Sequence, residues 1–272
     1  MIPVSSLTLL AVFAHPDDEA FGAGGTLAKY ASQGIDVYLV SATRGEAGGI
    51  AAPELATPAN LPAVRERELR AACEVYGIHP PLFLDYIDGQ LTIVNQGQAV
   101  GKLVRLIREL RPDVMITFGP EGIYGHYDHI AVHRWALAAY ELAADPDCFP
   151  DLDACRPHQT AKLYYRVIAE EALAARLASG QRVAVPMDGV PFYYGAWPAE
   201  QIAAVIDVSE FVDVKRRGIL CHATQIGVDT RYSTSPEEVM ADPWFRQETY
   251  TLARTTVGRA TQVETDLFHR LR

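Results

Sequence analysis

The hydrophobic positions of this chain fall into short continuous runs, and the segments between these runs carry a helical period. Residues 7–14 form the first run, Leu-Thr-Leu-Leu-Ala-Val-Phe-Ala, and polar residues begin directly after it. A short run without polar alternation is typical of a strand that is buried on both faces of a parallel sheet. Such runs predict strands over 7–14, 35–43, 82–86, 113–118, 162–169 and 203–208.

The intervening segments carry the signals of helices. Residues 63–76 are amphipathic and stop at Gly77, and residues 98–110 stop at Arg111-Pro112. The predicted helices cover 19–33, 63–76, 98–110, 128–144, 170–179 and 211–226, and the tail from Trp244 is also predicted to be helical. This alternation predicts an α/β fold with a mostly parallel, Rossmann-like sheet flanked by helices. No shift in composition marks a boundary, so residues 1–272 are predicted to form a single domain.

Two long segments show neither the apolar runs of strands nor the period of helices. Residues 44–62 are rich in Gly, Ala and Pro, and residues 145–160 are rich in Pro and Asp. Loops of this length are commonly functional, as lids or binding loops, so we expect both segments to shape substrate choice. Residues 183–198 are mixed and favour no particular element.

Charge and composition narrow the possible partners. The 272-residue chain has a formal net charge of −10, which disfavours nucleic acid and anionic membranes as partners. No apolar stretch is long enough to span a membrane, and no basic residue precedes Lys29 as a secretory signal would require. We therefore expect a cytoplasmic protein. The sequence leaves open whether it forms homo-oligomers.

The four cysteines show no C-x-x-C spacing, which gives no indication of a cysteine-based zinc site or a redox motif. A disulfide between Cys148 and Cys155 is conceivable, but reduced thiols are the expectation for a cytoplasmic protein. Cys221 beside His222 suggests a thiol nucleophile. Adjacent helix positions do not face each other, however, so we favour a structural role for this cysteine.

The most informative polar cluster follows the first predicted strand. His15, Asp17, Asp18 and Glu19 lie within five residues of one another. Ligands of open α/β sheets bind outside the carboxyl ends of the strands, so this cluster predicts a metal site. Glu19 alone fits equally well as an ordinary acidic residue at a helix start.

A second polar cluster, Tyr124-Gly125-His126-Tyr127-Asp128-His129, follows the strand predicted at 113–118. It should therefore reach the same edge of the sheet. His15, Asp18 and His129 would then supply the three protein ligands of a catalytic zinc site, which leaves one position for water. His133, four residues after His129, is a rival ligand by spacing, although we favour a structural or supporting role for it.

The remaining polar residues of the two clusters can transfer protons or stabilise the oxyanion during hydrolysis. Zinc lowers the pKa of a bound water to about 7 and polarises a carbonyl. Asp17 is placed to accept the proton of that water, and His126 to stabilise the oxyanion or protonate the leaving amine. Asp128 is expected to orient His126 and raise its pKa, and Tyr124 to donate a further hydrogen bond to the oxyanion.

Glycines after the first strand invite a nucleotide-binding interpretation. The segment Gly22-Ala23-Gly24-Gly25 departs from G-x-G-x-x-G at Leu27, and the preceding carboxylates would repel a pyrophosphate. We expect these glycines to let the helix approach the sheet. His222 and Gln225 are one helical turn apart, and either a shared site-facing position or a structural polar contact is compatible with this spacing.

These motifs resemble those of a known family. Ala14-His15-Pro16-Asp17-Asp18-Glu19 matches the signature of the LmbE-like superfamily, also called the PIG-L or N-acetylglucosaminylphosphatidylinositol de-N-acetylase family. The second cluster is similar to its Gly-His-Pro-Asp-His motif, with Tyr127 where proline is usual. Weaker matches extend the resemblance over about residues 9–227, namely Thr43-Arg44-Gly45-Glu46, Arg65-x-x-Glu68-Leu69, Asp88-Gly89 and His222-Ala223-Thr224-Gln225.

The resemblance implies a Rossmann-like fold and zinc-dependent removal of an acyl group from an amino sugar, with Fe(II) as an alternative metal. It assigns His15, Asp18 and His129 to the metal and Asp17 to the general base. It assigns His126 and Tyr124 to transition-state stabilisation, with Asp128 supporting His126. Arg65 and Asp88 fall where family members hold the sugar or its aglycone.

Three hypotheses of function follow. The first is a zinc-dependent N-deacetylase acting on a small N-acetylglucosaminyl compound. The second keeps the chemistry but takes a thiol conjugate or another amide, as the His222-Ala223-Thr224-Gln225 segment suggests. The third is a metal-binding protein without hydrolytic activity, which would leave Asp17, Tyr124 and His126 without tasks. A magnesium phosphotransferase is disfavoured, because magnesium prefers oxygen ligands to imidazole.

Overall fold

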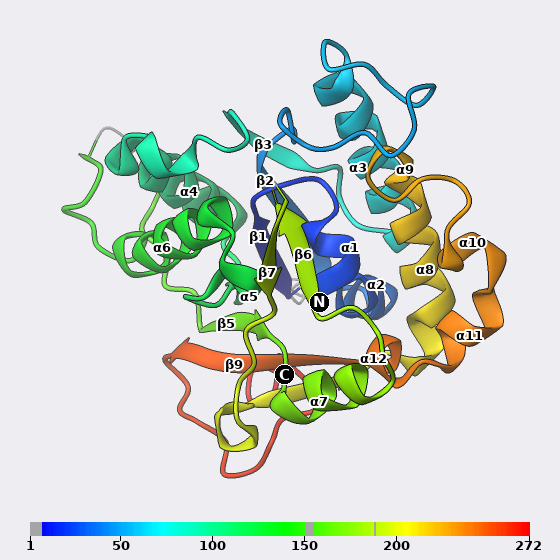
Figure 1. Cartoon of the computed structure of the whole chain (residues 1–272). Coiled ribbons are helices and arrows are strands. Elements are labelled where there is room, and N and C mark those ends of the chain that lie inside the picture. Colours follow the sequence, from blue (N-terminus) through cyan, green and yellow to red (C-terminus); the bar gives the residue numbers. More distant parts are fainter. Residues whose placement is uncertain (1–6, 151–154, 188) are drawn as a thin grey trace.

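A seven-stranded sheet forms the centre of the molecule (Figure 1). The computed structural model describes residues 7–150, 155–187 and 189–272. Within these residues the strand order is β3-β2-β1-β4-β5-β9-β8. The strands are β1 (Thr8–Phe13), β2 (Asp36–Thr43), β3 (Leu82–Tyr86), β4 (Val114–Phe118), β5 (Lys162–Val167), β8 (Ala204–Asp207) and β9 (Gln247–Thr255).

The first five strands of the sheet are parallel, and β9 runs antiparallel to both of its neighbours. Every residue of β1, β4 and β5 is buried, which explains the continuous apolar runs of β1 and β4, whereas β5 also buries Lys162 and Arg166. The chain adds β2 and β3 on one side of β1, and β4 and β5 on the other. The strand order therefore reverses between β1 and β4, and ligands of such sheets bind at this point.

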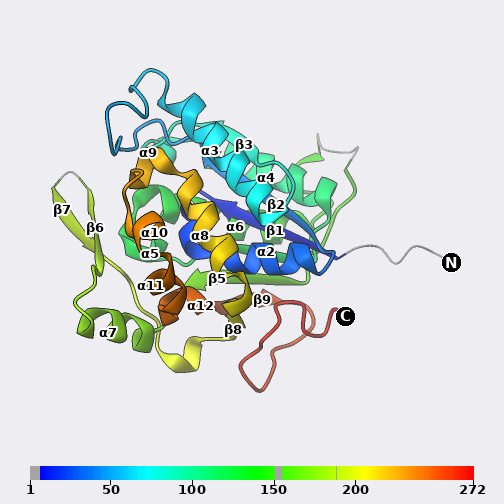
Figure 2. The same cartoon turned by 90° about the vertical axis from the view of Figure 1, so that its right-hand side faces the viewer.

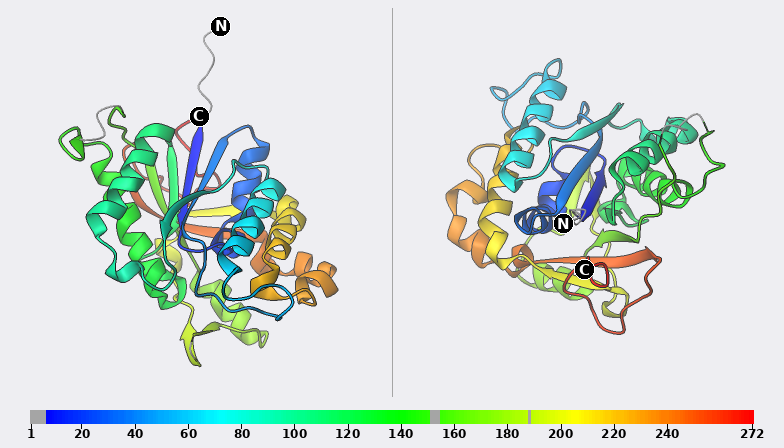
Figure 3. Two further views of the ribbon diagram at one scale, coloured as in Figure 1. Left: turned by 90° about the horizontal axis from the view of Figure 1, so that it is seen from above. Right: turned by 180° about the vertical axis from the view of Figure 1, so that it is seen from behind.

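Two helical layers cover the sheet (Figures 1 and 3). One layer contains α4 and α6, which pack against each other, and α6 also contacts β1 and β4. The other layer contains α2, α3 and α8, and α2 contacts β2. The longer helices are α2 (Gly24–Ser32), α3 (Leu61–Tyr76), α4 (Gln96–Leu110), α6 (Tyr127–Leu142), α7 (Glu170–Ala178) and α8 (Val212–Cys221). The predicted fold class is thus confirmed.

The predicted helix over 19–33 is two helices, α1 (Asp18–Gly22) and α2. The break lies at Ala23, which has non-helical dihedral angles. Close packing explains the two glycines that open α2. A Cβ atom at Gly25 would lie 2.7 Å from Val208, and one at Gly24 would lie 3.0 Å from the Tyr76 hydroxyl. These glycines let α2 approach α3 and the residue that follows β8, whereas the expectation was a close approach to the sheet itself.

The prediction that the tail from Trp244 is helical is wrong. Only α12 (Pro243–Arg246) is helical there, and the chain continues as β9 between β5 and β8. The segment Gln-Glu-Thr-Tyr-Thr-Leu-Ala-Arg-Thr is rich in β-branched and aromatic residues, and Tyr250 and Leu252 pack into the core. The strand-like composition of this segment decided the outcome.

The predicted helix over 211–226 is also divided. It forms α8 and the short α9 (Ala223–Ile226), with His222 between them in a non-helical conformation. The remaining short helices are α5 (Gly122–Gly125), α10 (Arg231–Thr234) and α11 (Pro236–Ala241). None of the helices in the described part of the chain is long and apolar enough to cross a membrane.

The mixed segment 183–198 contains a two-stranded antiparallel hairpin, β6 (Ala184–Met187) and β7 (Val190–Tyr193). Figure 2 shows this hairpin projecting from the body of the molecule on the side where α9 and α10 lie. Val190 and Tyr193 are exposed. Cys148 and Cys155 are both free thiols, so the conceivable disulfide is not formed.

Candidate metal site and substrate cavity

The carboxyl end of β1 positions the first polar cluster. After Ala14 the chain turns sharply, and the Asp18 carboxylate accepts hydrogen bonds from the backbone N–H groups of His15 (2.8 Å) and Ala14 (3.2 Å). These bonds use one oxygen, Oδ2, and fix the carboxylate at the strand end. The other oxygen, Oδ1, is directed toward the second cluster, where it lies 3.1 Å from Nε2 of His129.

The loop after β4 and the start of α6 position His129. Its ring stacks on Phe118, the last residue of β4, with a centroid separation of 4.1 Å. Its Nδ1 lies 3.1 Å from the carbonyl oxygen of Gly122, to which it can donate a hydrogen bond. This bond leaves Nε2 with a free lone pair, which is the usual arrangement of a histidine that binds a metal.

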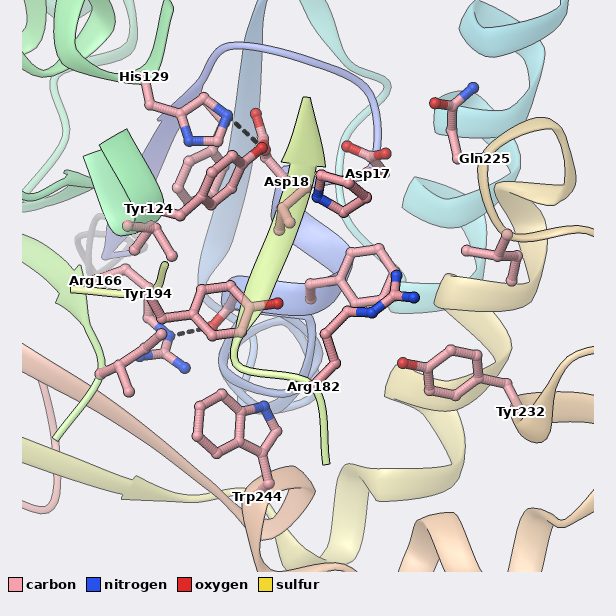
Figure 4. Close-up of a pocket in the computed structure, with 18 of the residues that line it drawn as sticks. Asp17, Asp18, Tyr124, His129, Arg166, Arg182, Tyr194, Gln225, Tyr232 and Trp244 are labelled. Carbon is pink, nitrogen blue, oxygen red and sulfur yellow. Dashed lines mark hydrogen bonds and ion pairs between the residues drawn. The ribbon is translucent and has the colours of Figure 1, made fainter. Parts of the chain in front are cut away.

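His15, Asp18 and His129 converge as the sequence predicted they would, with ligand atoms within 4.8 Å of one another. His15 Nδ1 lies 3.5 Å from Asp18 Oδ2. The buried Nε2 of His129 has no hydrogen-bond partner among the described residues. Two imidazole nitrogens and a carboxylate are a donor set that suits zinc and related divalent metals. The residues present therefore fit a metal ion (Figure 4 shows His129 facing Asp18).

The far side of the His15 ring contacts two carboxylates. Nε2 of His15 lies 2.9 Å from Asp88 and 3.3 Å from Asp128. In the metal-free chain, hydrogen bonds from His15 to Asp128, Asp18 and Asp88 outweigh burial and raise its pKa well above the usual value. Carboxylates that accept from the outer nitrogen of a histidine fix its tautomer and orientation toward a metal.

This placement differs from the role predicted for Asp128. Its carboxylate accepts hydrogen bonds from the backbone N–H groups of Gly89 (2.6 Å) and Leu91 (3.2 Å), besides contacting His15. Its hydrogen bond to His126 comes from the backbone, because the Asp128 N–H donates to His126 Nδ1 at 3.1 Å. Asp128 therefore orients His15, and it ties the segment after β3 to the start of α6.

His126 caps the N-terminus of α6 through that same bond. Burial, with the neighbouring His129 and His15, lowers the pKa of His126 to about 4, although Asp18 and Asp128 act in the raising direction, as predicted for Asp128. Because Nδ1 accepts a hydrogen bond, the neutral ring carries its proton on Nε2 and can donate from there. The ring lies 4.8 Å from the His15 ring, centroid to centroid.

Asp17 lies beside the metal-ligand cluster with a strained backbone, since its φ of 116° is in the left-handed region. The buried Arg65 guanidinium contacts its carboxylate at 3.3 Å and donates to the carbonyl oxygens of Pro16 and Gly45. Burial raises the pKa of Asp17 to about 6, despite the opposing effect of Arg65. A carboxylate with a raised pKa next to a metal site is suited to accept a proton.

Arg65 and Asp88 were expected to hold the substrate. Neither is among the described residues that line the cavity. Arg65 is 3% exposed and supports Asp17, while Asp88 contacts His15 and accepts from the Ala47 N–H at 3.2 Å. Both residues therefore contact other residues of the site, and their role in holding a substrate stays a prediction.

The weaker sequence motifs form a supporting network around these residues. Glu19 is buried and accepts a hydrogen bond from the Asp17 N–H (3.0 Å), and its other oxygen pairs with His222 at 2.7 Å. Glu19 also lies in the first turn of α1, so it is an acidic residue at a helix start that has two buried partners as well. Glu68 on α3 accepts from both the N–H and the hydroxyl of Thr224, at 2.8 and 2.6 Å. The segment around His222 thus braces the loop that carries Asp17.

The remaining candidates take distinct positions. Tyr124 lines the cavity beside His129, with a ring-centroid separation of 5.2 Å, and burial raises the pKa of its phenol above the usual value. His133 lies outside the group of potential metal ligands, and its Nδ1 bonds the carbonyl oxygen of Phe118. Gln225 reaches the cavity wall and donates to the carbonyl oxygen of Gly49.

A cavity of about 660 Å³ opens from the metal-ligand cluster. Asp17, Asp18, Tyr124 and His129 lie at one end, which we call the near end (Figure 4). The other end, the far end, is lined by Arg166, Arg176, Arg182, Tyr194, Lys215, Arg231, Tyr232 and Trp244. Nothing in the sequence motifs singled these residues out, because they come from separate segments with no recognisable spacing.

The two predicted binding loops differ in their relation to this cavity. Gly49, Ile50 and Ala51 of the loop 44–62 line it. In the segment 145–160, residues 151–154 lie outside the described residues, and no described residue of that segment contributes to the lining. The structure thus supports a substrate-shaping role for the first loop only.

The fold and the site together define a class, the α/β proteins that carry a divalent-metal site at the carboxyl ends of parallel strands. Residues 10–140 match the family described as "PIG-L: GlcNAc-PI de-N-acetylase". A 1D-myo-inositol 2-acetamido-2-deoxy-alpha-D-glucopyranoside deacetylase of Streptomyces avermitilis is 39% identical, with 96% of each chain covered. The chain belongs to the PIG-L family of de-N-acetylases.

Two further similarities are to an amidase in sequence and to a solved deacetylase in fold. A mycothiol S-conjugate amidase of Streptomyces coelicolor is 30% identical, with 98% of each chain covered. The N,N'-diacetylchitobiose deacetylase from Pyrococcus horikoshii superposes with a TM-score of 0.67 at 20% identity, covering 91% of this chain and 84% of the other. This last likeness concerns the fold, which agrees with the sheet and helix layers described above.

Proposed function

We propose that this protein is a zinc-dependent hydrolase that removes the N-acetyl group from an N-acetylglucosaminyl conjugate. The convergence of His15, Asp18 and His129, with the buried Nε2 of His129 facing Asp18 at 3.1 Å and making no hydrogen bond to the described residues, is the observation that carries the proposal. The similarity to the deacetylase of Streptomyces avermitilis over nearly the full chain supports the choice of an amino-sugar conjugate.

His15 Nδ1, His129 Nε2 and the Asp18 carboxylate would hold the ion. A bound zinc ion supplies a Lewis acid, which makes water nucleophilic near neutral pH and polarises the acyl carbonyl. Asp17 accepts the proton of the attacking water, since its carboxylate lies beside the cluster and has a raised pKa. Arg65 holds this carboxylate in place from behind.

The developing oxyanion needs hydrogen-bond donors. Tyr124 keeps its hydroxyl proton because its pKa is raised, and neutral His126 presents an N–H at Nε2. Both groups can therefore donate to the oxyanion without losing a proton. Protonated Asp17 then returns its proton to the leaving nitrogen, so that acetate and a free amine are the products.

A second candidate substrate is the amide of a thiol conjugate, which the similarity to the amidase of Streptomyces coelicolor supports. The same residues would perform the same steps on either amide. The two candidates differ only in the groups on each side of the scissile bond, so that kinetics on matched substrates can separate them.

The test combines a substrate panel with one variant. Zinc-loaded protein should release acetate from N-acetylglucosaminyl glycosides, and Asp17→Asn should lower kcat by about 10²- to 10⁴-fold while it retains the metal. Asp213→Asn, an exposed carboxylate on α8, is the matched control and should keep full activity.

The outcomes discriminate the alternatives. Turnover of thiol-conjugate amides without turnover of any acetylated amino sugar would replace the first substrate by the second. Full activity of Asp17→Asn would remove the general-base assignment. Metal binding without hydrolysis of any amide in the panel would overturn the hydrolase and leave a metal-binding protein.

A further inference from the structure

The far end of the cavity is strongly cationic, although the whole chain is acidic with a net charge of −10. Five basic side chains line it, and they come from β5, α7, the segment before β6, α8 and α10, namely Arg166, Arg176, Arg182, Lys215 and Arg231. An accumulation of one charge sign in a cavity focuses the electrostatic potential and attracts a ligand of the opposite sign.

Only two of these cations have a carboxylate partner among the ion pairs of the described residues. Lys215 pairs with the buried Glu248 at 2.7 Å, and Arg231 lies 3.5 Å from Asp242. Arg166, Arg176 and Arg182 form no ion pair in the described part of the chain. The far end therefore carries an excess of three positive charges before a substrate binds.

Arg176 makes two contacts that orient its guanidinium and retains one buried nitrogen without a hydrogen-bond partner among the described residues. Its Nε donates to the backbone carbonyl oxygen of Arg182 at 2.7 Å, and its guanidinium lies 4.7 Å from the centre of the Trp244 ring. Its Nη1 is buried and has no hydrogen-bond partner among the described residues. An unpaired buried donor costs free energy, and a ligand that accepts from it would remove that cost.

Arg166 forms no ion pair in the described part of the chain, and buried Glu248, which already pairs with Lys215, acts on it only from a longer distance. Arg166 is 7% exposed, and its partners are the carbonyl oxygens of Gly22, Val167 and Thr249 together with the Thr249 hydroxyl. All of these partners are neutral. A buried charge is normally paired, so a counter-charge supplied by a ligand would complete this site.

The same cavity contains the proposed reaction centre. Figure 4 shows Arg182 and Tyr194 pointing into the space that Asp17 and Asp18 border. The carboxylates at the near end would repel an anion, whereas the arginines at the far end would attract one. Charge therefore fixes the orientation of a substrate that fills the cavity, whose volume suits a ligand of disaccharide size or larger.

We propose that the substrate carries an anionic group, a carboxylate or a phosphate, remote from the scissile amide, and that Arg176 and Arg182 bind this group at the far end of the cavity. The proposal rests on the proposed function for the identity of the scissile bond. Tyr194 and Trp244 pack against the body of the substrate, and buried Arg166 contributes to the potential that attracts its anionic group.

The kinetic test compares matched N-acetylglucosaminyl glycosides whose aglycones carry a carboxylate, a phosphate, no charge or an ammonium group. We expect kcat/KM to be at least about tenfold higher for one of the two anions than for the neutral glycoside, and lowest for the cation. The ranking of carboxylate and phosphate identifies the anion. Equal rates for all four compounds would overturn the proposal.

Arg182→Gln should abolish this preference, so that the anionic and neutral glycosides have similar kcat/KM. Arg182 is the appropriate variant because its side chain is exposed and supports no buried contact of the fold. Arg67→Gln, which removes an equal charge from an exposed position of α3 outside the cavity, is the matched control. An equal loss of preference in both variants would indicate a general charge effect and would contradict the proposed site.

Binding of the deacetylated glucosaminyl glycosides, measured by calorimetry on the metal-free protein, tests the anion site independently of catalysis. The anionic compounds should bind at least about tenfold more tightly than the neutral one, and Arg182→Gln should remove the difference. Failure to hydrolyse any glycoside while this binding difference persists would refute the proposed function and support the anion site. Hydrolysis of the glycosides without any binding difference would support the proposed function and refute the anion site.

Discussion

The two ends of the cavity are built in different ways. At the near end, Asp18 accepts hydrogen bonds from two backbone N–H groups, and buried His129 bonds a carbonyl oxygen and stacks on the Phe118 ring. At the far end, Arg182 is exposed, and the hairpin that follows it pairs with no other strand in the described part of the chain.

The match to the PIG-L family includes the near end of the cavity and stops before the residues of the far end. The match to the PIG-L family covers residues 10–140, which include all of the proposed metal ligands and Asp17. The cationic and aromatic residues of the far end lie between 166 and 244, after that match. The matched part of the chain therefore carries the proposed ligands and Asp17, while the later part, from β5 onward, carries the contacts that would select a substrate.

The largest expected effect comes from the near end. Asp18→Asn removes the negative charge of the proposed ligand set but keeps an oxygen that can accept from the His15 N–H. We expect the bound metal to fall well below one equivalent and kcat/KM to fall by about 10³-fold or more, because the Lewis acid contributes several kcal/mol. Metal analysis and steady-state kinetics test this, with Asp213→Asn as the control. Retention of both metal and activity would contradict the ligand assignment.

A second prediction concerns Glu248, the buried partner of the far-end residue Lys215. Glu248 pairs with the buried Lys215 and accepts from the N–H groups of Gly25 and Thr26 at the start of α2. Glu248→Gln leaves Lys215 buried without its counter-charge, so the free energy of unfolding should fall by about 3 kcal/mol at neutral pH. Glu141→Gln, on an exposed pair with Arg254, should change it by less than about 1 kcal/mol.

The pH dependence of this effect has a defined sign. Glu248 is buried, which by itself would raise its pKa, but Lys215 and the neighbouring donors outweigh burial and hold the pKa below the usual value of 4.5. Its stabilising contribution is therefore complete above about 4.5 and is lost as the pH falls through the lower, folded-state pKa. Urea unfolding should show that the difference in free energy of unfolding between wild type and Glu248→Gln is smaller at acidic than at neutral pH. A difference that does not change with pH would show that the charge of Glu248 is not the source of its stabilising effect.

The smallest effect is expected at the wall of the far end. Trp244 packs against Arg176 and lies 6.4 Å from the Tyr194 ring, centroid to centroid. Trp244→Ala should raise KM by about tenfold, through loss of a cation–π contact and of apolar packing, and should leave kcat nearly unchanged. Steady-state kinetics with the preferred glycoside separate the two constants. A fall in kcat at constant KM would show that the two ends are not functionally separate.

The sequence could predict the near end because the rules involved are local. Buried parallel strands have continuous apolar runs, and their carboxyl ends meet at one edge of the sheet. His15, Asp18 and His129 could therefore be placed together from two short motifs. The tail from Trp244 was missed because β9 is an antiparallel strand whose position depends on β5 and β8, neither of which is adjacent to it in sequence.

By itself, the sequence determined the α/β architecture and the three proposed metal ligands, because strand periodicity and ligand chemistry can be read from neighbouring residues. Only the tertiary structure decided that Arg65 supports Asp17, that Glu19 pairs with His222 across 203 residues, and that Asp128 orients His15. It also brought the arginines of the far end into one cavity. Such contacts depend on how distant segments pack, and a side chain gives no local sign of the partner it will meet.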